Sequence, residues 1–254
     1  MCLGEEKGDE ESMCVLIISD IHGNRSAFQE VLGQAERRHK ITSCILLGDL
    51  IDYGMHSNEV IKMARTLPYK VLCSLRGNHE EAVIRGEYSR FSSDRGRRSA
   101  RYTKSVLTSD SWDYISREME QGGKKEFELN GKKCLAVHGS LEDEYWKSIR
   151  PESGLLEYDK YDYVFSGHSH LPHMFESYYE CEDVNRRNKK KVIFINPGSV
   201  GQPRNLDNRA QYAVLNMERG EIAFEKAEYD IETEQAAFCG QVDDFYCERL
   251  RWGI

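Results

Sequence analysis

The chain has 254 residues, of which 39% are hydrophobic and 31% charged, and its formal net charge is −8. This composition is typical of a globular protein that buries a full core. The negative charge argues against nucleic acid or an anionic membrane as a bulk partner, because both favour a basic protein face. No apolar run in the sequence reaches the roughly 18 residues that would span a bilayer.

The eight cysteines are scattered along the chain, and none forms a Cys-x-x-Cys pair. Cys44, Cys73 and Cys134 lie within apolar runs, where a thiol acts as a small hydrophobic group. We therefore expect neither disulfides nor a zinc–thiolate site, and a reducing cytoplasm is the expected location.

The chain opens with the acidic, polar stretch MCLGEEKGDEES, which has neither the basic start nor the apolar middle of a secretory signal. We interpret residues 1–13 as a disordered leader and residues 14–254 as a single domain. Short apolar runs in this domain predict buried strands of an α/β sheet. These runs are Val15–Ser19, Cys44–Leu47, Val71–Leu75, Cys134–Val137, Tyr163–Ser166 and Val192–Ile195.

Helical patterns connect the first three predicted strands. Apolar residues first recur with the spacing of one helical face at Phe28, Val31, Leu32 and Ala35, and then at Val60, Met63, Ala64 and Leu67. Ser26 and Gln29 resemble a capping box for the first helix. Ser57 is the expected cap of the second helix, and Pro68 its expected end. This alternation indicates a layered α/β domain.

The middle of the chain has a different character. Residues 85–104 carry seven basic and two acidic residues, a local balance of +5, and we expect a basic helical insertion at about 85–120. Trp112, Ile115 and Met119 predict a helix there, capped by Ser109 or Asp110. Further on, QYAVLNM and EIAFEKAEYD flank ERGE and predict a β-hairpin. A closing helix is expected around Val242, Phe245, Tyr246 and Leu250.

Polar residues beside glycine follow five of the predicted strands. The motifs are Asp20-Ile21-His22-Gly23-Asn24, Gly48-Asp49-Leu50-Ile51-Asp52, Gly77-Asn78-His79-Glu80, His138-Gly139 and Gly167-His168-Ser169-His170. Each motif alone is compatible with a turn or a helix cap. Together they contain five of the eight histidines, and in open α/β sheets ligands bind at the carboxyl ends of the strands.

The five motifs offer carboxylate, amide and imidazole groups, which suit divalent ions of the manganese, iron or zinc type. The candidate metal ligands are Asp20, His22, Asp49, Asn78, His138, His168 and His170. One ion takes about four to six ligands, so this set predicts two ions that share one ligand. Such an ion pair is used for in-line displacement at phosphorus.

The stretches SDIHGN, GDLIDYG, RGNHE, VHGS and GHSH resemble the five motifs of the calcineurin-like metallophosphoesterase superfamily. INPGSVGQPR, residues 195–204, is similar to the compact bacterial and archaeal phosphodiesterase-like branch of that superfamily. The resemblance implies a four-layer αββα sandwich with two mixed sheets. It also implies a dimetal-dependent phosphoesterase that hydrolyses a phosphate ester or anhydride by attack of a metal-bridging hydroxide.

The resemblance places each candidate ligand. Asp20, His22 and His170 would hold one ion. Asn78, His138 and His168 would hold the other, and Asp49 would bridge both. His79 would stabilise or protonate the leaving oxygen, and Asp52 would orient His79. The expected cofactors are two divalent ions (Mn, Fe, Ni or Zn), with manganese favoured.

Substrate recognition is less well defined by the sequence. The protein phosphatases of the superfamily carry arginine where this chain has Tyr53, which argues against a dedicated phosphoprotein phosphatase. Arg204, Arg25, and Arg97 with Arg98 of the basic insertion are candidates for binding substrate phosphates. The insertion is either a lid over the metal crevice or a solvated helix face.

The expected substrate is a small phosphorylated compound, with a nucleotide as one option. A dinucleoside polyphosphate hydrolase and a phosphoprotein phosphatase stay open as alternatives, and so does a non-catalytic metal-binding scaffold. A nuclease has local support only from the run RRNKKK at residues 186–191, which a charged hairpin loop explains more simply. No membrane partner is expected, and a homo-oligomer stays open.

Overall fold

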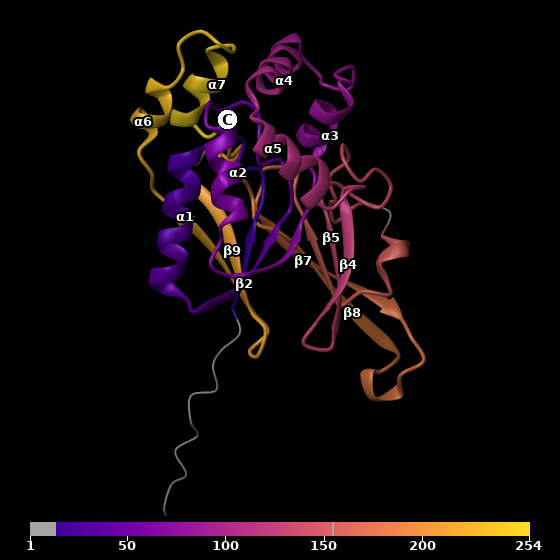
Figure 1. The fold of residues 1–254 in the computed structure, drawn as a ribbon. Helices are drawn as coiled ribbons and strands as arrows, with labels where there is room; N and C mark the ends of the chain where they lie inside the picture. The colour runs from indigo at the N-terminus through magenta and orange to yellow at the C-terminus, as the bar shows by residue number, and fades with distance from the viewer. Residues whose placement is uncertain (1–13, 154) are drawn as a thin grey trace, which may run out of the picture.

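The computed structural model describes residues 14–153 and 155–254. The leader predicted at residues 1–13 lies outside the described residues. Two five-stranded mixed sheets form the centre of the molecule (Figure 1). In order across the first sheet, the strands are β10 (Glu221–Ala227), β9 (Ala210–Asn216), β1 (Cys14–Ile18), β2 (Ile41–Leu46) and β3 (Lys70–Ser74). In the second they are β4 (Lys124–Leu129), β5 (Lys132–Val137), β6 (Tyr163–Ser166), β8 (Lys189–Asn196) and β7 (His173–Glu180).

Each sheet has a parallel centre and antiparallel edges. In the first sheet β1, β2 and β3 run parallel, whereas β9 is antiparallel to both β1 and β10. In the second sheet β5, β6 and β8 run parallel, whereas β4 and β7 are antiparallel to their neighbours. The carboxyl ends of β1, β2, β3, β5 and β6 therefore carry the loops that hold the sequence motifs.

Side-chain alternation along the strands builds the layers. Leu16 and Ile18 of β1 face the helices, whereas Val15 and Ile17 pack between the two sheets. This follows from the period of two along a strand, which sends successive side chains to opposite faces. A third core covers the outer face of the second sheet and includes Val164. The predicted αββα order of layers is confirmed, although the last layer is mostly an irregular segment with one 3₁₀ turn, Leu156–Tyr158.

The helices flank the first sheet and the upper end of the molecule in Figure 1. The α-helices are α1 (Arg25–Arg38), α2 (Ser57–Arg65), α3 (Asn78–Arg85), α4 (Asp94–Val106), α5 (Ser109–Asp113), α6 (Ile231–Ala236) and α7 (Phe245–Glu248). A π turn at Tyr114–Glu118 follows α5, and 3₁₀ turns occur at Val184–Arg186 and at Arg249–Arg251, the latter labelled η4 below. The predicted closing helix is thus the short α7 together with η4.

The predicted helix starts are each wrong by a residue or two. The side chain of Asn24, not of Ser26, accepts the capping hydrogen bond of α1. Ser57 is the first residue of α2, and its hydroxyl oxygen accepts a hydrogen bond from the backbone N–H of Asp52 instead. Thr108, not Ser109 or Asp110, caps α5. In α1 and α5 a neighbouring polar side chain caps the helix, whereas α2 starts after His56 without a side-chain cap. Several polar residues near a helix start can fill this role, which is why boundaries are the weakest sequence prediction.

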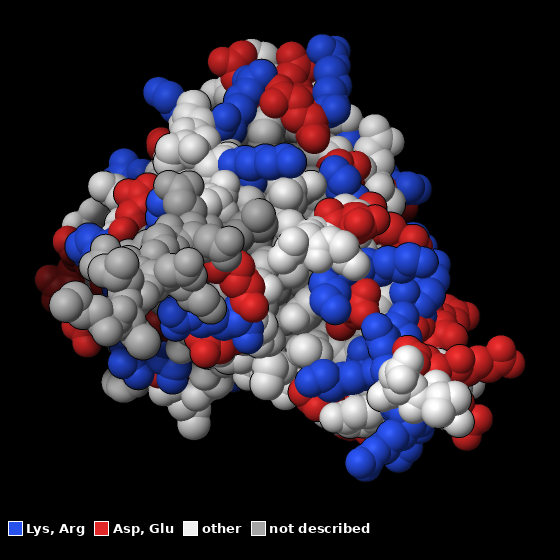
Figure 2. Space-filling view, turned by 90° about the horizontal axis from the view of Figure 1, so that it is seen from below, with Lys and Arg blue, Asp and Glu red and all other residues white. Residues whose placement is uncertain are grey.

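All six predicted strands and the predicted hairpin are present, but β4 and β7 were not expected. The basic run at residues 186–191 belongs to the turn and first residues of the β7–β8 hairpin, as the simpler interpretation predicted. Figure 2 views the molecule from below, where Lys and Arg lie intermixed with Asp and Glu over the described part of this face. No helix among the described residues is long and apolar enough to cross a membrane.

Candidate metal centre

The candidate ligands come from five loops at the carboxyl ends of strands in both sheets. Asp20 and His22 follow β1, and Asp49 follows β2. The remaining four donors follow β3, β5 and β6: Asn78, His138, His168 and His170. Their ligand atoms form two compact groups, one of Asp20, His22 and His170 and the other of Asp49, His138 and His168.

The backbone of these loops is strained where the donors sit. Asp20, His22, Asp49, His168 and His170 all have positive φ, between 49° and 64°. A non-glycine residue in this left-handed region is unfavourable, and such strain persists only where the surroundings fix the conformation. Five of the seven predicted ligands share this rare geometry, so the loops direct several side chains inward at a cost in local stability.

Hydrogen bonds to backbone carbonyl groups orient three of the histidines. The Nδ1 atoms of His22, His138 and His170 lie 3.1, 2.8 and 2.5 Å from the carbonyl oxygens of Ile51, Leu47 and Gln202 respectively. Since a carbonyl oxygen only accepts, each Nδ1 carries the proton. The lone pair of each Nε2 then faces the centre of the site, which is the arrangement of metal-binding imidazoles.

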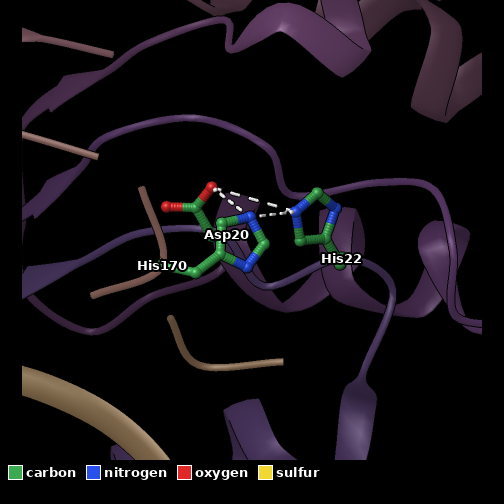
Figure 3. Close-up of side chains that lie close together, drawn as sticks. All are labelled: Asp20, His22 and His170. Carbon is green, nitrogen blue, oxygen red and sulfur yellow. Dashed lines mark hydrogen bonds and ion pairs between the residues drawn. The ribbon is translucent and has the colours of Figure 1, made fainter. Parts of the chain in front are cut away.

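The lone pairs in the first group face one another. The Nε2 atoms of His22 and His170 are 3.2 Å apart, and the Nε2 atom of His170 is 3.1 Å from Oδ1 of Asp20 (Figure 3). Oδ2 of Asp20 accepts hydrogen bonds from Ser19 and from the backbone N–H of His168, whereas its buried Oδ1 has no hydrogen-bond partner. Three electron-rich atoms at this separation repel unless a cation lies among them.

The second group converges in the same way. Oδ1 of Asn78 lies 3.0 Å from Nε2 of His138 and 2.9 Å from Nδ1 of His168. Oδ2 of Asp49 is 3.3 Å from Nε2 of His138 and 3.8 Å from Nε2 of His22. Asp49 therefore reaches both groups, as expected of a shared ligand. The residues present fit two divalent ions, because imidazole, carboxylate and amide oxygen point inward from buried positions.

Burial and charge decide the ionisation of these groups. Burial lowers the pKa of His168 to about 4, and burial with His79 nearby holds the pKa of His22 well below its usual range, so both rings are neutral. Burial opposes the ionisation of Asp49, but the neighbouring His138 and His79 outweigh it and lower its pKa well below the usual value. Burial lowers the pKa of His138, but the carboxylate of Asp49 outweighs it and raises this pKa to about 9. The His138 ring therefore gives up a proton when a cation binds, whereas His22 and His168 are already neutral.

His79 and Asp52 form a separate pair beside the two groups. Nδ1 of His79 lies 2.7 Å from Oδ2 of Asp52, and Nε2 of His79 faces Oδ2 of Asp49 at 3.9 Å. Burial lowers the pKa of His79, but Asp49 and Asp52 raise it more, so its net pKa is raised and the ring favours the protonated state. The ligand atoms of His79, His22 and Asp49 also lie close enough together to hold a metal ion.

Helix α4 of the basic segment contacts this pair through hydroxyl groups. Oδ1 of Asp52 accepts hydrogen bonds from Oγ of Ser99 at 2.5 Å and from Oγ1 of Thr103 at 2.9 Å. Both side chains are buried on the inner face of α4. The basic character of residues 85–104 drew attention to the arginines, and sequence reasoning missed these two polar residues.

Sequence reasoning also missed the role of Glu80 in holding the loops of the site. Its buried carboxylate accepts hydrogen bonds from the backbone N–H groups of Asp49, Leu50, Ile51 and Gly77. It thereby ties the loop after β2 to the start of α3. Gly77 makes this close approach possible, because a Cβ atom there would lie 2.1 Å from Oδ1 of Asp49.

The predicted phosphate-binding arginines lie in different places. Arg204 lines the cavity beside the metal ligands. Arg97 instead bonds to Asp94 and to the carbonyl oxygen of Phe91, and Arg98 pairs with Asp243 at 3.3 Å. Arg25 is the first residue of α1 and does not line this cavity. The structure thus brings only Arg204 of the four to the donors.

The cavity over the donors has a volume of about 280 Å³ and includes side chains that sequence reasoning missed. The Phe91 ring lies edge-on to His79, with ring centroids 4.9 Å apart, and the ring centroids of Trp146 and His168 are 6.3 Å apart. The Arg90 guanidinium sits 5.1 Å from the Trp146 ring and pairs with Asp143. The cavity therefore combines an aromatic wall with two arginines, Arg90 and Arg204.

Comparison with known proteins agrees with this geometry. The model of the calcineurin-like phosphoesterase superfamily domain matches residues 13–220. The chain belongs to this superfamily, whose members are metal-dependent phosphoesterases that use divalent ions. The family inferred from the five motifs is thus confirmed.

Individual relatives cover nearly the whole chain. A metallophosphoesterase from Sphaerobacter thermophilus is 27% identical, with a TM-score of 0.75 over 96% of this chain and 100% of that one. An uncharacterized protein of Methanocaldococcus jannaschii is 29% identical over 85% of this chain and 88% of its own length. A hypothetical protein from Pyrococcus horikoshii has a TM-score of 0.76 at 18% identity, over 95% of this chain and 99% of that one, and shares the fold.

Proposed function

We propose that this chain is a dimetal-dependent phosphoesterase that hydrolyses an ester or anhydride bond of a small phosphorylated compound. The observation that carries the proposal is the convergence of seven donors from five strand ends on two groups that Asp49 joins. A scaffold that has lost its metals would have no need for this complete set. The strained loops argue in the same direction, since strain of this kind is retained for function.

In this proposal Asp20, His22 and His170 hold one ion, and Asn78, His138 and His168 hold the other. Two divalent ions, with manganese favoured over iron, nickel and zinc, would activate a water nucleophile and neutralise phosphoryl charge. His79 donates a proton to the leaving oxygen from Nε2. Asp52 holds the ring through Nδ1 and supports its protonated state.

The cavity favours a compact substrate. Arg204 and Arg90 supply positive charge at its wall, and Phe91 with Trp146 suit a planar aromatic group such as a nucleobase. Tyr53 lies 4.5 Å from His79, at the position where protein phosphatases of the superfamily carry arginine. We therefore favour a nucleotide or a related diester over a phosphoprotein. The buried thiols Cys44 and Cys73 support a reducing, cytoplasmic location for the enzyme.

A substrate panel on reconstituted protein tests the proposal. Protein stripped of metal is reloaded separately with Mn²⁺, Fe²⁺, Ni²⁺ or Zn²⁺ and assayed on phosphomonoesters, phosphodiesters, diadenosine polyphosphates and phosphopeptides. We expect metal-dependent hydrolysis that is strongest on a diester or an anhydride. Hydrolysis at the full rate after exhaustive chelation, or no hydrolysis with any ion, would contradict the proposal.

A further inference from the structure

Three arginines from separate segments gather beside the candidate metal centre. Arg95 comes from α4, Arg204 from the loop after β8, and Arg249 from η4. The guanidinium carbons of Arg95 and Arg249 lie 3.7 and 5.0 Å from the centroid of the Phe245 ring. Helix α4 carries Arg95, and helix α7 runs directly into η4 with Arg249. Both helices lie near each other at the upper end of the molecule in Figure 1. We refer to Arg95, Arg204 and Arg249 as the arginine cluster.

Aromatic stacking joins the arginine cluster to the metal centre. Tyr246 of α7 stacks on Tyr53 with ring centroids 4.3 Å apart and an interplanar angle of 16°. The ring centroid of Tyr53 also lies 4.6 Å from that of His22 and 4.5 Å from that of His79. Arg204 lines the same cavity as Tyr53 and His79. Arg204 therefore lines the cavity with the metal ligands, and the stacked Tyr53 and Tyr246 connect that cavity to the segment that carries Arg249.

Arg249 is a buried cation without a carboxylate partner. It is only 6% exposed, and its Nε atom has no hydrogen-bond partner. Within residues 14–153 and 155–254, no acidic side chain pairs with the guanidinium of Arg249, Arg95 or Arg204. Two other arginines of α4 are paired, Arg97 with Asp94 and Arg98 with Asp243. A buried charge is costly when nothing compensates it, so the lack of an acid at this place calls for a function.

Arg249 remains positively charged although it is buried. Burial and the nearby Arg204 lower its pKa to about 10, so the guanidinium still carries its charge at neutral pH. The ionisable neighbours that act on it most strongly are Arg204, Tyr53, Tyr246 and Arg95, all of which are cationic or neutral there. The region is therefore positive and partly shielded from water, where attraction for an anion is stronger than in bulk solvent.

We propose that the arginine cluster is a subsite for a second phosphate of the substrate, one that lies beyond the phosphate attacked at the metal centre. The exposed Arg204 and Arg95 offer paired N–H donors that match phosphate oxygens. The buried Arg249 strengthens the positive potential behind them. The inference rests on the proposed phosphoesterase function and narrows its substrate to compounds that carry two phosphates.

Binding of pyrophosphate to metal-free protein tests the subsite without using activity. By calorimetry, we expect wild-type protein to bind pyrophosphate and Arg204→Met to bind it at least about tenfold more weakly, the equivalent of one charge-assisted contact. Arg95→Met and Arg249→Met should weaken pyrophosphate binding to a similar extent. If substitution of the buried Arg249 impairs folding, the variant at the exposed Arg204 still tests the subsite. Arg186→Met, which removes an exposed charge in the β7–β8 hairpin, should leave affinity unchanged. Equal affinity in wild type and Arg204→Met, or no binding at all, would overturn the inference.

A matched pair of substrates then identifies the source of the bound anion. The nitrophenyl ester of thymidine 5′-phosphate is compared with the same ester carrying an additional 3′-phosphate, so that the scissile bond is unchanged. We expect the 3′-phosphate to raise kcat/KM, mainly through KM, and this advantage to fall toward one in Arg204→Met and in Arg95→Met but not in Arg186→Met. Arginine-dependent binding of pyrophosphate with no such advantage would mean that the cluster holds free phosphate, and would overturn the assignment to substrate. Arginine-dependent binding with neither ester cleaved would contradict the proposed function and leave the anion subsite standing.

Discussion

Asp49 is the side chain on which both donor groups depend. Its Oδ2 atom lies 3.3 Å from His138 and 3.8 Å from His22, and its Oδ1 accepts a hydrogen bond from the backbone N–H of His79. Two cations held a few ångströms apart repel strongly, and a shared carboxylate offsets that repulsion.

Replacing this carboxylate should therefore remove metal and activity together. We expect Asp49→Asn to lose at least one ion per chain and to slow hydrolysis by about 10³-fold or more, at least as much as removal of a single charge-stabilising donor. Elemental analysis and steady-state kinetics measure the two effects. Asp94→Asn, an exposed carboxylate paired with Arg97, is the matched control and should change neither. Two full equivalents of metal in Asp49→Asn would show that the carboxylate is not shared.

The contacts of His79 fit two different roles, that of a metal ligand and that of a proton donor. Its Nδ1 contacts Asp52, its Nε2 lies 3.9 Å from Oδ2 of Asp49, and the residue lines the cavity. As a proton donor, His79→Gln should keep both ions and lose about 10²–10⁴ in rate, the usual size of general acid catalysis. The loss should shrink for nitrophenyl esters, whose leaving group needs no proton, relative to alkyl esters. Loss of an ion in His79→Gln would instead make this histidine a ligand, in line with its position beside His22 and Asp49.

Helix α4 acts on the site through the hydroxyl groups of two side chains. Ser99 and Thr103 both donate to Oδ1 of Asp52, whose other oxygen bonds His79. The helix thus fixes the carboxylate that fixes the proposed acid. Its arginines Arg97 and Arg98 are engaged by acidic groups, so the idea of a lid built from those two has no support in the geometry.

Removing one of these hydroxyl groups should change the chemistry more than the fold. We expect Thr103→Val to destabilise the protein by about 1 kcal/mol, the usual value of one hydrogen bond. It should also slow alkyl ester cleavage several-fold while sparing nitrophenyl esters, because the orientation of His79 suffers. Ser105→Ala removes a hydroxyl on the same helix that bonds the carbonyl of Tyr102, and is the matched control. A uniform loss on both kinds of ester would point to a merely structural role.

Two strands of the structure, β4 and β7, were missed by the sequence analysis. β4 and β7 are antiparallel edge strands with alternating burial, and each mixes apolar and charged residues, as in KKEFEL and HMFESYYE. The central strands are apolar runs because both of their faces are covered. An edge strand with one exposed face has no such run, and only the neighbouring strand decides that it pairs.

The two sheets and the C-terminal segment meet at one end of the molecule to form the site. Donors from β1, β2 and β3 face donors from β5 and β6, and η4 brings Arg249 near Arg204 and Tyr53, which line the same cavity. Because the strained loops hold electron-rich atoms in contact, ion binding should relieve repulsion throughout this end.

Metal should therefore stabilise the entire fold. At an ion concentration of about 100 times Kd, binding contributes about 2.7 kcal/mol per site, and a chain of this size gains roughly 2–4 °C in Tm per kcal/mol. We expect Mn²⁺ to raise Tm by several degrees in a calorimetric scan and a chelator to reverse the change. Asp49→Asn should show a smaller shift. An unchanged Tm at saturating Mn²⁺ would contradict a built metal centre.

The central strands, the family and the set of donors could all be predicted from the amino-acid sequence. Apolar runs that end in glycine and polar residues are local signals, and five such ends in one chain specify a shared chemistry at one sheet edge. The family resemblance also implied that His168 and His170 bind different ions, and their ligand atoms lie in different groups.

The residues that surround the donors could not be predicted, because they come together only when the chain folds. Ser99 and Thr103 meet Asp52 across about fifty residues, and Arg249 approaches Arg204 from the far end of the chain. Such contacts leave no periodic or local trace, because packing between separate layers creates them. A helix that looked basic in sequence therefore contacts the site through two hydroxyls. A C-terminal arginine that looked ordinary becomes a buried charge without an acidic partner, near Arg204 and Tyr53.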